Sequence, residues 1–233
     1  MSQREAISAL GIIADFYSHP VKLGDDQSEH SIDAVSLRRE EVEYLASLVS
    51  LYKPVNTLEI GLALASSTVA IMGTKLEYEK SETHIALDPF QELHARNAGL
   101  REVNRLGLSE SLNHIPRFSE DYLNECFLAG KKFDFIFIDG KHTIGQAVAD
   151  AFLSDKVMNR NGIIAIHDSL LFSTAASVKY LLFERGYKMI SARRFNVKTM
   201  LRMVKYLSTL GWFYAVNVVP RINTSIIALQ KCD

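Results

Sequence analysis

Two acidic residues and a glycine are spaced as a binding site for a charged small molecule requires. Glu59 and Gly61 lie at the end of one predicted strand, and Asp88 ends the next. Gly61 permits a sharp turn and the close approach of a ligand, while Glu59 suits a ligand that carries an ammonium group. Asp88 is placed to accept hydrogen bonds from both hydroxyls of a ribose. An amino-acid end at one strand and a ribose at the next together describe S-adenosylmethionine.

The small residues after Gly61 extend this candidate site. Ala63 precedes a helix that is predicted to begin at Ser67, and the amides at its start can hold a carboxylate. A dinucleotide site favours GxGxxG, whereas this turn has one glycine, which argues against an NAD-dependent oxidoreductase. A purely structural alternative remains, in which Gly61 is an ordinary turn glycine and Asp88 caps a helix next to Pro89.

A second group of polar residues follows two later strands. Asp139 and Asp168 end neighbouring predicted strands, so their carboxylates could share one Mg²⁺ ion. His142 is the candidate general base for removing a proton from an acceptor hydroxyl, and a nearby helix N-terminus is expected to favour its neutral form. Alternatively, Asp139 contacts the cofactor, Asp168 caps the following helix, and His142 is a surface histidine.

The elements that position these residues alternate between strands and helices. Five apolar runs are predicted as strands and are followed by helical patterns: 57–60, 84–87, 112–115, 133–138 and 163–166. The strands lack polar alternation, as expected when both faces of a sheet are covered by helices. The pattern predicts a doubly wound, Rossmann-like α/β fold with a seven-stranded, mostly parallel sheet.

We expect a single domain of 1–233 with four parts. These are an N-terminal helical extension (1–50), a cofactor-binding core (51–189), an insert that could form a lid (190–222) and a last strand (223–233). The insert combines an apolar, aromatic block with a locally basic stretch that includes Arg193 and Arg194. A helix packed on the core is the alternative to the lid.

Composition narrows the classes of partner. The chain of 233 residues has a net charge of −1, which does not encourage binding to nucleic acid. Two isolated cysteines, no signal-peptide pattern and no long apolar run predict a cytoplasmic protein without a transmembrane segment. A small-molecule substrate and a homo-oligomer are both compatible with this composition.

Four motifs in order resemble those of class I S-adenosylmethionine-dependent methyltransferases. They are LEIG…SST, IALDPFQ, FDFIFIDGKHT and GIIAIHD, and the likeness is greatest to a bacterial branch with DPFQ and IDGxH. The resemblance implies that Glu59, Gly61 and Ala63 line the methionine end of the cofactor. It also implies that Asp88 binds the ribose, with Pro89 and Phe90 beside the adenine and Ser119 at its edge, and that the last strand runs antiparallel.

The sequence departs from the family pattern at two positions. Ala65 replaces the second glycine of the first turn, and Ser169 stands where metal-dependent relatives have asparagine after an aspartate. The resemblance implies direct in-line methyl transfer, with O-methylation of a small molecule as the expected reaction. A regulatory protein with a degenerate cofactor pocket stays open as an alternative, as does an NAD-dependent oxidoreductase on a similar fold.

Overall fold

A computed structural model describes residues 8–78, 83–190, 197–222 and 224–232 of the chain. The chain divides into two compact units, Met1–Phe118 and Ser119–Asp233. Residues 191–196 of the predicted insert, Arg193 and Arg194 among them, lie outside the described residues. Whether the chain behaves as one domain therefore stays a prediction, and each unit is described by itself.

The first unit is built on three parallel strands in the order β5-β4-β3. Thr57 pairs with His84 and Ile60 with Leu87, so β3 and β4 end at the same level. Both strands are wholly buried, as their unbroken apolar runs predicted. The elements of this unit are α1 (Ala9–Ser18), β1 (Val21–Leu23), β2 (Glu29–Ser31), α2 (Ile32–Val35), α3 (Arg39–Tyr52), β3 (Thr57–Ile60), α4 (Ser66–Lys75), β4 (His84–Leu87), α5 (Gln91–Ala95), α6 (Ala98–Arg105), η1 (Ser109–Ser111) and β5 (Leu112–Ile115).

Two features of this unit differ from the sequence prediction. The antiparallel pair β1–β2 lies within a region that was expected to be helical. The helical pattern that follows 84–87 forms two helices rather than one, because Arg96 and Asn97 adopt left-handed φ values of 47° and 60°. The break lets α6 begin against the first turn, where Gly99 has no room for a side chain: a Cβ there would lie 2.3 Å from the Ala63 carbonyl oxygen.

The second unit contains four strands in the order β6-β7-β9-β8. Strands β6 and β7 are parallel, and β9 runs antiparallel to both β7 and β8, which confirms the predicted antiparallel last strand. The short β8 was not predicted. The elements of this unit are α7 (Ser119–Leu128), β6 (Phe133–Ile138), α8 (Ile144–Val157), β7 (Met158–Ile166), α9 (Phe172–Glu184), β8 (Tyr187–Met189), α10 (Val197–Leu210), η2 (Tyr214–Val218), η3 (Val219–Arg221) and β9 (Ile227–Lys231).

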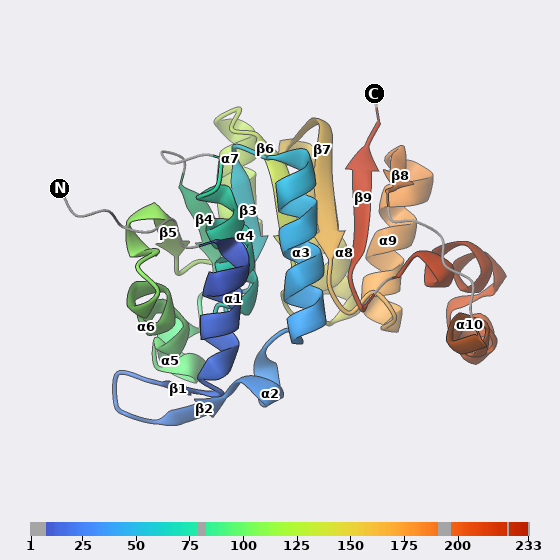
Figure 1. The fold of residues 1–233 in the computed structure, drawn as a ribbon. Helices are drawn as coiled ribbons and strands as arrows, with labels where there is room; N and C mark the ends of the chain where they lie inside the picture. The colour runs from blue at the N-terminus through green and yellow to red at the C-terminus, as the bar shows by residue number, and fades with distance from the viewer. Residues whose placement is uncertain (1–7, 79–82, 191–196, 223, 233) are drawn as a thin grey trace. The chain divides into compact units, whose positions relative to one another are not determined.

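Alternation of strands and helices in both units confirms the α/β class. Figure 1 shows the helices of each unit packed along its strands. The three strands β5-β4-β3 and the four strands β6-β7-β9-β8 together give the seven strands expected. Within the described residues, every helix is too short or too polar to cross a bilayer.

Candidate functional site

The turn after β3 has an unusual backbone that brings its amides to one place. Gly61, Ala63 and Ala65 have left-handed φ values of 92°, 45° and 70°. Glycine adopts this conformation freely, whereas an alanine loses roughly 1–2 kcal/mol in it. Two strained alanines at one turn need strong compensating contacts, and these contacts come from the end of β4.

Asp88 supplies them by accepting four hydrogen bonds from groups in the first unit. The backbone amides of Leu62 and Ala63 donate to its Oδ2 at 3.2 and 3.0 Å, and the Phe90 amide donates to Oδ1 at 2.8 Å. The Gln91 side chain donates to Oδ2 at 3.0 Å. The structure thus brings Asp88 to the Gly61 turn as predicted, but it also gives this carboxylate a structural task. The bond from Phe90 N resembles the helix-capping alternative, since α5 begins at the next residue.

Gln91 is a functional candidate that we did not predict from the sequence. Its Nε2 donates to the Ala63 carbonyl at 2.6 Å as well as to Asp88, and the side chain is buried. Gln91 therefore ties the strained turn to the end of β4. The DPFQ motif contained this residue, but its spacing alone did not indicate that the glutamine reaches back across 28 positions.

Glu59 lies beneath the turn and is 0% exposed. Its Oε1 accepts a hydrogen bond from the Thr68 hydroxyl and lies 3.3 Å from His84 Nε2. Its Oε2 is buried and has no hydrogen-bond partner among the described residues. A buried carboxylate oxygen without a partner is costly, and an ammonium group would satisfy it. This orphan oxygen fits the predicted role of Glu59 at the amino-acid end of a ligand.

Aromatic side chains gather around Phe90, two residues after Asp88. Phe90 is 39% exposed and stacks on His94 with ring centroids 4.8 Å apart. It also meets Phe118 edge-on at 5.7 Å. Pro89 is half-buried between Asp88 and Phe90. This accessible aromatic edge fits a flat base, the role that the resemblance gives to Pro89 and Phe90.

Two predicted cofactor residues have side chains turned into the protein. Ser67 is buried in the first turn of α4. Ser119, in the second unit, donates to buried Asp150 and accepts from Gln146 at 3.2 Å. Burial raises the pKa of Asp150, and the hydrogen bonds that its carboxylate accepts from Ser119 and from Gln146 oppose this rise. The side chain of Ser119 is therefore engaged within its own unit, and its predicted place at the adenine edge stays a prediction.

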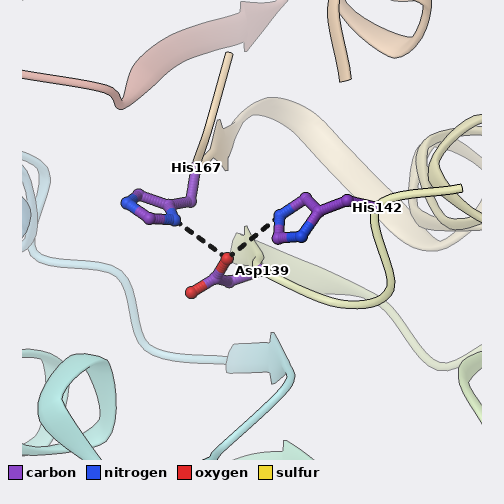
Figure 2. Close-up of side chains that lie close together, drawn as sticks. All are labelled: Asp139, His142 and His167. Carbon is purple, nitrogen blue, oxygen red and sulfur yellow. Dashed lines mark hydrogen bonds and ion pairs between the residues drawn. The ribbon is translucent and has the colours of Figure 1, made fainter. Parts of the chain in front are cut away.

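The ends of β6 and β7 bring together four titratable side chains of the second unit. His167 Nδ1 lies 2.9 Å from Asp139 Oδ1, and His142 Nε2 lies 3.5 Å from the same oxygen, as Figure 2 shows. His142 Nε2 also lies 3.6 Å from Asp168 Oδ2. The structure thus assembles the three residues predicted here, Asp139, His142 and Asp168. It adds His167, which was not among the residues predicted for this group.

Electrostatics favour a protonated His142. Its pKa is raised, first by the hydrogen bond to Asp139 and then by the charges of Asp139 and Asp168, against burial and the charge of His167. Burial alone would raise the pKa of Asp139, but its hydrogen bonds to the two histidines, together with their charges, lower it. The expectation that a helix N-terminus favours neutral His142 is therefore wrong: the two carboxylates outweigh it.

The donor set fits the predicted Mg²⁺ ion poorly. Asp139, His142 and His167 offer ligand atoms that lie within 4.8 Å of one another, but two of the three are imidazole nitrogens, whereas Mg²⁺ prefers oxygen ligands. The His142 ring lies between the carboxylates of Asp139 and Asp168, in the place that an ion shared by the two would need. These side chains therefore do not form the oxygen-rich site that Mg²⁺ requires.

Ser169, the third residue after β7, explains one departure from the family pattern. Ser169 is wholly buried, and both its amide and its hydroxyl donate to the Ser225 carbonyl, at 3.0 and 2.7 Å. The Tyr214 hydroxyl donates to the Ser169 carbonyl. Ser169 thus anchors the chain leading into β9 and the segment around Tyr214, rather than presenting a ligand. No side chain caps the start of α9, so the capping alternative for Asp168 is not observed.

Comparisons with known proteins agree with this arrangement. Residues 58–169, which include both groups of site residues, match the family model described as a methyltransferase domain. The match supports the predicted methyltransferase class. No curated protein matches it by sequence.

Solved structures share the fold at low sequence identity. An O-methyltransferase from Bacillus cereus in complex with SAH is 13% identical over 99% of this chain and 93% of its own, with a TM-score of 0.62. The O-methyltransferase TomG from Streptomyces achromogenes, in complex with SAM, is 12% identical over 100% of both chains, with a TM-score of 0.61. Cofactor-bound Rv0187 from MTB is 16% identical over 96% of this chain and 88% of its own, with a TM-score of 0.62. These likenesses establish the Rossmann-like methyltransferase fold.

Proposed function

We propose that this protein transfers the methyl group of S-adenosylmethionine to an oxygen atom of a small molecule. The observation that carries the choice of oxygen is His142, whose Nε2 lies 3.5 Å from Asp139 and 3.6 Å from Asp168. A hydroxyl is a poor nucleophile until its proton leaves, and a histidine oriented by carboxylates is suited to accept that proton. The solved O-methyltransferases of the same fold agree with this proposal.

The first unit supplies the cofactor-binding residues in this proposal. The unpartnered Oε2 of Glu59 receives the ammonium group, and the amides at the start of α4 face the carboxylate. Asp88 holds the turn in shape and accepts from the ribose through Oδ1, which receives one hydrogen bond within the protein, while Phe90 and Pro89 contact the base. Binding by these residues would orient the methyl group before transfer, which is a large part of catalysis.

The second unit supplies proton removal. S-adenosylmethionine provides an electrophilic methyl group, so that a C–O bond forms on the acceptor as the C–S bond breaks. His142 takes the proton of the acceptor hydroxyl and must be deprotonated beforehand. Asp139 orients the ring and stabilises the imidazolium that results, and its bond to His167 fixes the position of the carboxylate.

Residues 197–222 are proposed to border the acceptor pocket as a lid. The Tyr214 hydroxyl donates a hydrogen bond to the carbonyl of Ser169, the residue that follows Asp168. The segment is therefore anchored at the carboxyl end of β7, the edge at which open α/β sheets bind ligands. The alternative of a degenerate regulatory pocket loses support from the assembled His142 cluster, and a nicotinamide cofactor is disfavoured by the single glycine of the turn.

Calorimetry and turnover test these proposals separately. We expect the purified protein to bind S-adenosylmethionine and S-adenosylhomocysteine, and to bind NAD at least tenfold more weakly. A panel of phenols, catechols and sugars assayed for release of S-adenosylhomocysteine should then identify a hydroxyl acceptor. Equal affinity for NAD would contradict the cofactor assignment, and turnover with amine acceptors alone would contradict O-methylation.

A further inference from the structure

The C-terminal part of the second unit has a charge composition unlike the rest of the chain. Residues 186–230 contain seven lysines and arginines and no aspartate or glutamate, while the other 19 of the 26 basic residues and all 27 acidic residues lie elsewhere. A protein with a net charge of −1 thus concentrates positive charge in one segment. The seven residues are Lys188, Arg193, Arg194, Lys198, Arg202, Lys205 and Arg221.

Within this segment, α10 exposes a stripe of apolar side chains. Met200, Leu201 and Val204 are 60%, 67% and 73% exposed, and Leu207 continues the stripe at 41%. Their spacing of one, three and four residues places them on one side of a helix. Lys205 follows Leu201 by four residues, so an exposed cation borders the same stripe.

The opposite side of α10 attaches the helix to its own unit. Leu210 is buried, and its carbonyl accepts a hydrogen bond from Lys179 of α9 at 2.8 Å. Helix α10 also contacts η2 and η3, and Figure 1 shows it beyond α9 at the margin of the unit. The apolar stripe is therefore not the face that packs on the protein, and its exposure needs a different explanation.

Aromatic side chains extend the apolar surface past the end of α10. Trp212 is 70% exposed, and the next residue, Phe213, packs against exposed Phe183 with ring centroids 4.6 Å apart. Tryptophan is favoured where an apolar medium meets a polar one, because its ring has an apolar body and a polar N–H group. Large exposed apolar side chains beside several cations describe a helix that lies in a lipid interface.

We propose that α10 and Trp212 dock on the surface of a bilayer that contains anionic lipids. Charge complementarity selects this partner: the segment is cationic throughout, and anionic headgroups attract each nearby lysine or arginine. A second copy of the chain would place the same cationic surface against itself in a two-fold dimer. Nucleic acid would leave the stripe from Met200 to Leu207 in water. The inference is independent of the proposed methyl acceptor.

Trp212 is the single tryptophan of the chain, so its fluorescence reports on this surface alone. We expect its emission to shift to shorter wavelength when the full-length protein is mixed with vesicles of phosphatidylcholine and phosphatidylglycerol at low salt. Brominated lipid should quench it. Pure phosphatidylcholine vesicles should bind at least tenfold more weakly, and raising the salt should release the protein from the mixed vesicles.

Substitutions separate the two contributions to binding. Leu201→Ser with Val204→Ser should weaken vesicle binding about tenfold or more because apolar burial is lost. Lys205→Ala should weaken it about fivefold. Leu128→Ser is the matched control: Leu128 is 77% exposed at the end of α7, and its replacement should leave binding unchanged.

Several results would overturn the proposal. One is unchanged Trp212 emission with anionic vesicles at low salt. Another is binding that Leu128→Ser reduces as much as the α10 variants do. A third is a dimer in sedimentation equilibrium that Val204→Asp dissociates while vesicle binding is undetectable, since the stripe would then be an interface between copies. Circular dichroism of every variant should match the wild type, because all substituted side chains are exposed.

Discussion

Replacing Asp88 by alanine gives the most direct test of the turn. The carboxylate accepts from the amides of Leu62, Ala63 and Phe90 and from the Gln91 side chain, at 2.8–3.2 Å. A hydrogen bond to a charged group contributes about 1.5–3 kcal/mol, but donors near the surface recover part of this from water. We therefore expect Asp88→Ala to lower the free energy of unfolding by about 3 kcal/mol, a large part of the total stability of a typical domain.

Urea denaturation followed by circular dichroism measures this loss, and calorimetry with S-adenosylhomocysteine at a temperature where the variant is folded measures binding. Asp121→Ala is the matched control, because Asp121 is exposed in the first turn of α7 and its loss should change stability by less than about 1 kcal/mol. If Asp88→Ala unfolds within about 0.5 kcal/mol of the wild type, Asp88 is not the clamp of the turn. Weakened binding without lost stability would indicate ribose recognition alone.

Three further predictions concern the two groups of site residues. His142→Gln should lower the single-turnover rate of methyl transfer about 10²–10⁴-fold and leave cofactor affinity unchanged; a wild-type rate would remove His142 from the mechanism. Asp139 raises the pKa of His142, and the base must be deprotonated to act, so the wild-type rate should rise with pH through that pKa. Asp139→Asn should move the inflection of this pH–rate profile to lower pH. An inflection that stays in place would contradict the pairing of His142 with Asp139. Gly99→Ala should destabilise the protein by about 1–3 kcal/mol in thermal denaturation, because its Cβ would lie 2.3 Å from a backbone oxygen. Gly145→Ala is the control: its Cβ would meet nothing within 4 Å, so the same measurement should find it neutral or slightly stabilising.

Four strands of this fold, β3 to β6, could be predicted from the sequence because each is a largely apolar run with a clear end. The prediction for 57–60, 84–87, 112–115 and 133–138 matches β3 to β6. The break between α5 and α6 could not be predicted in the same way. It depends on two left-handed residues and on the room that Gly99 leaves beside Ala63, and both are properties of packing rather than of hydrophobic spacing.

The same distinction applies to the candidate site. Which residues end neighbouring strands follows from spacing, so Glu59 with Asp88 and Asp139 with Asp168 could be named from the sequence. Which donors each carboxylate meets depends on side-chain directions, and these revealed Gln91 as a partner of Asp88. Sequence spacing therefore predicts the position of a charged group better than it predicts the hydrogen-bond partners of that group.

His142 illustrates the consequence for mechanism. From the sequence, its place near a helix start suggested a neutral ring, because the N-terminal partial charge disfavours a cation. In the structure its Nε2 lies within 3.6 Å of oxygens from both Asp139 and Asp168, and two full negative charges outweigh a partial positive one. The raised pKa of His142 favours the protonated ring, and a protonated ring cannot accept a proton. Catalysis by His142 therefore requires that this proton leave before the acceptor reacts, so the rate should rise with pH through the raised pKa of His142.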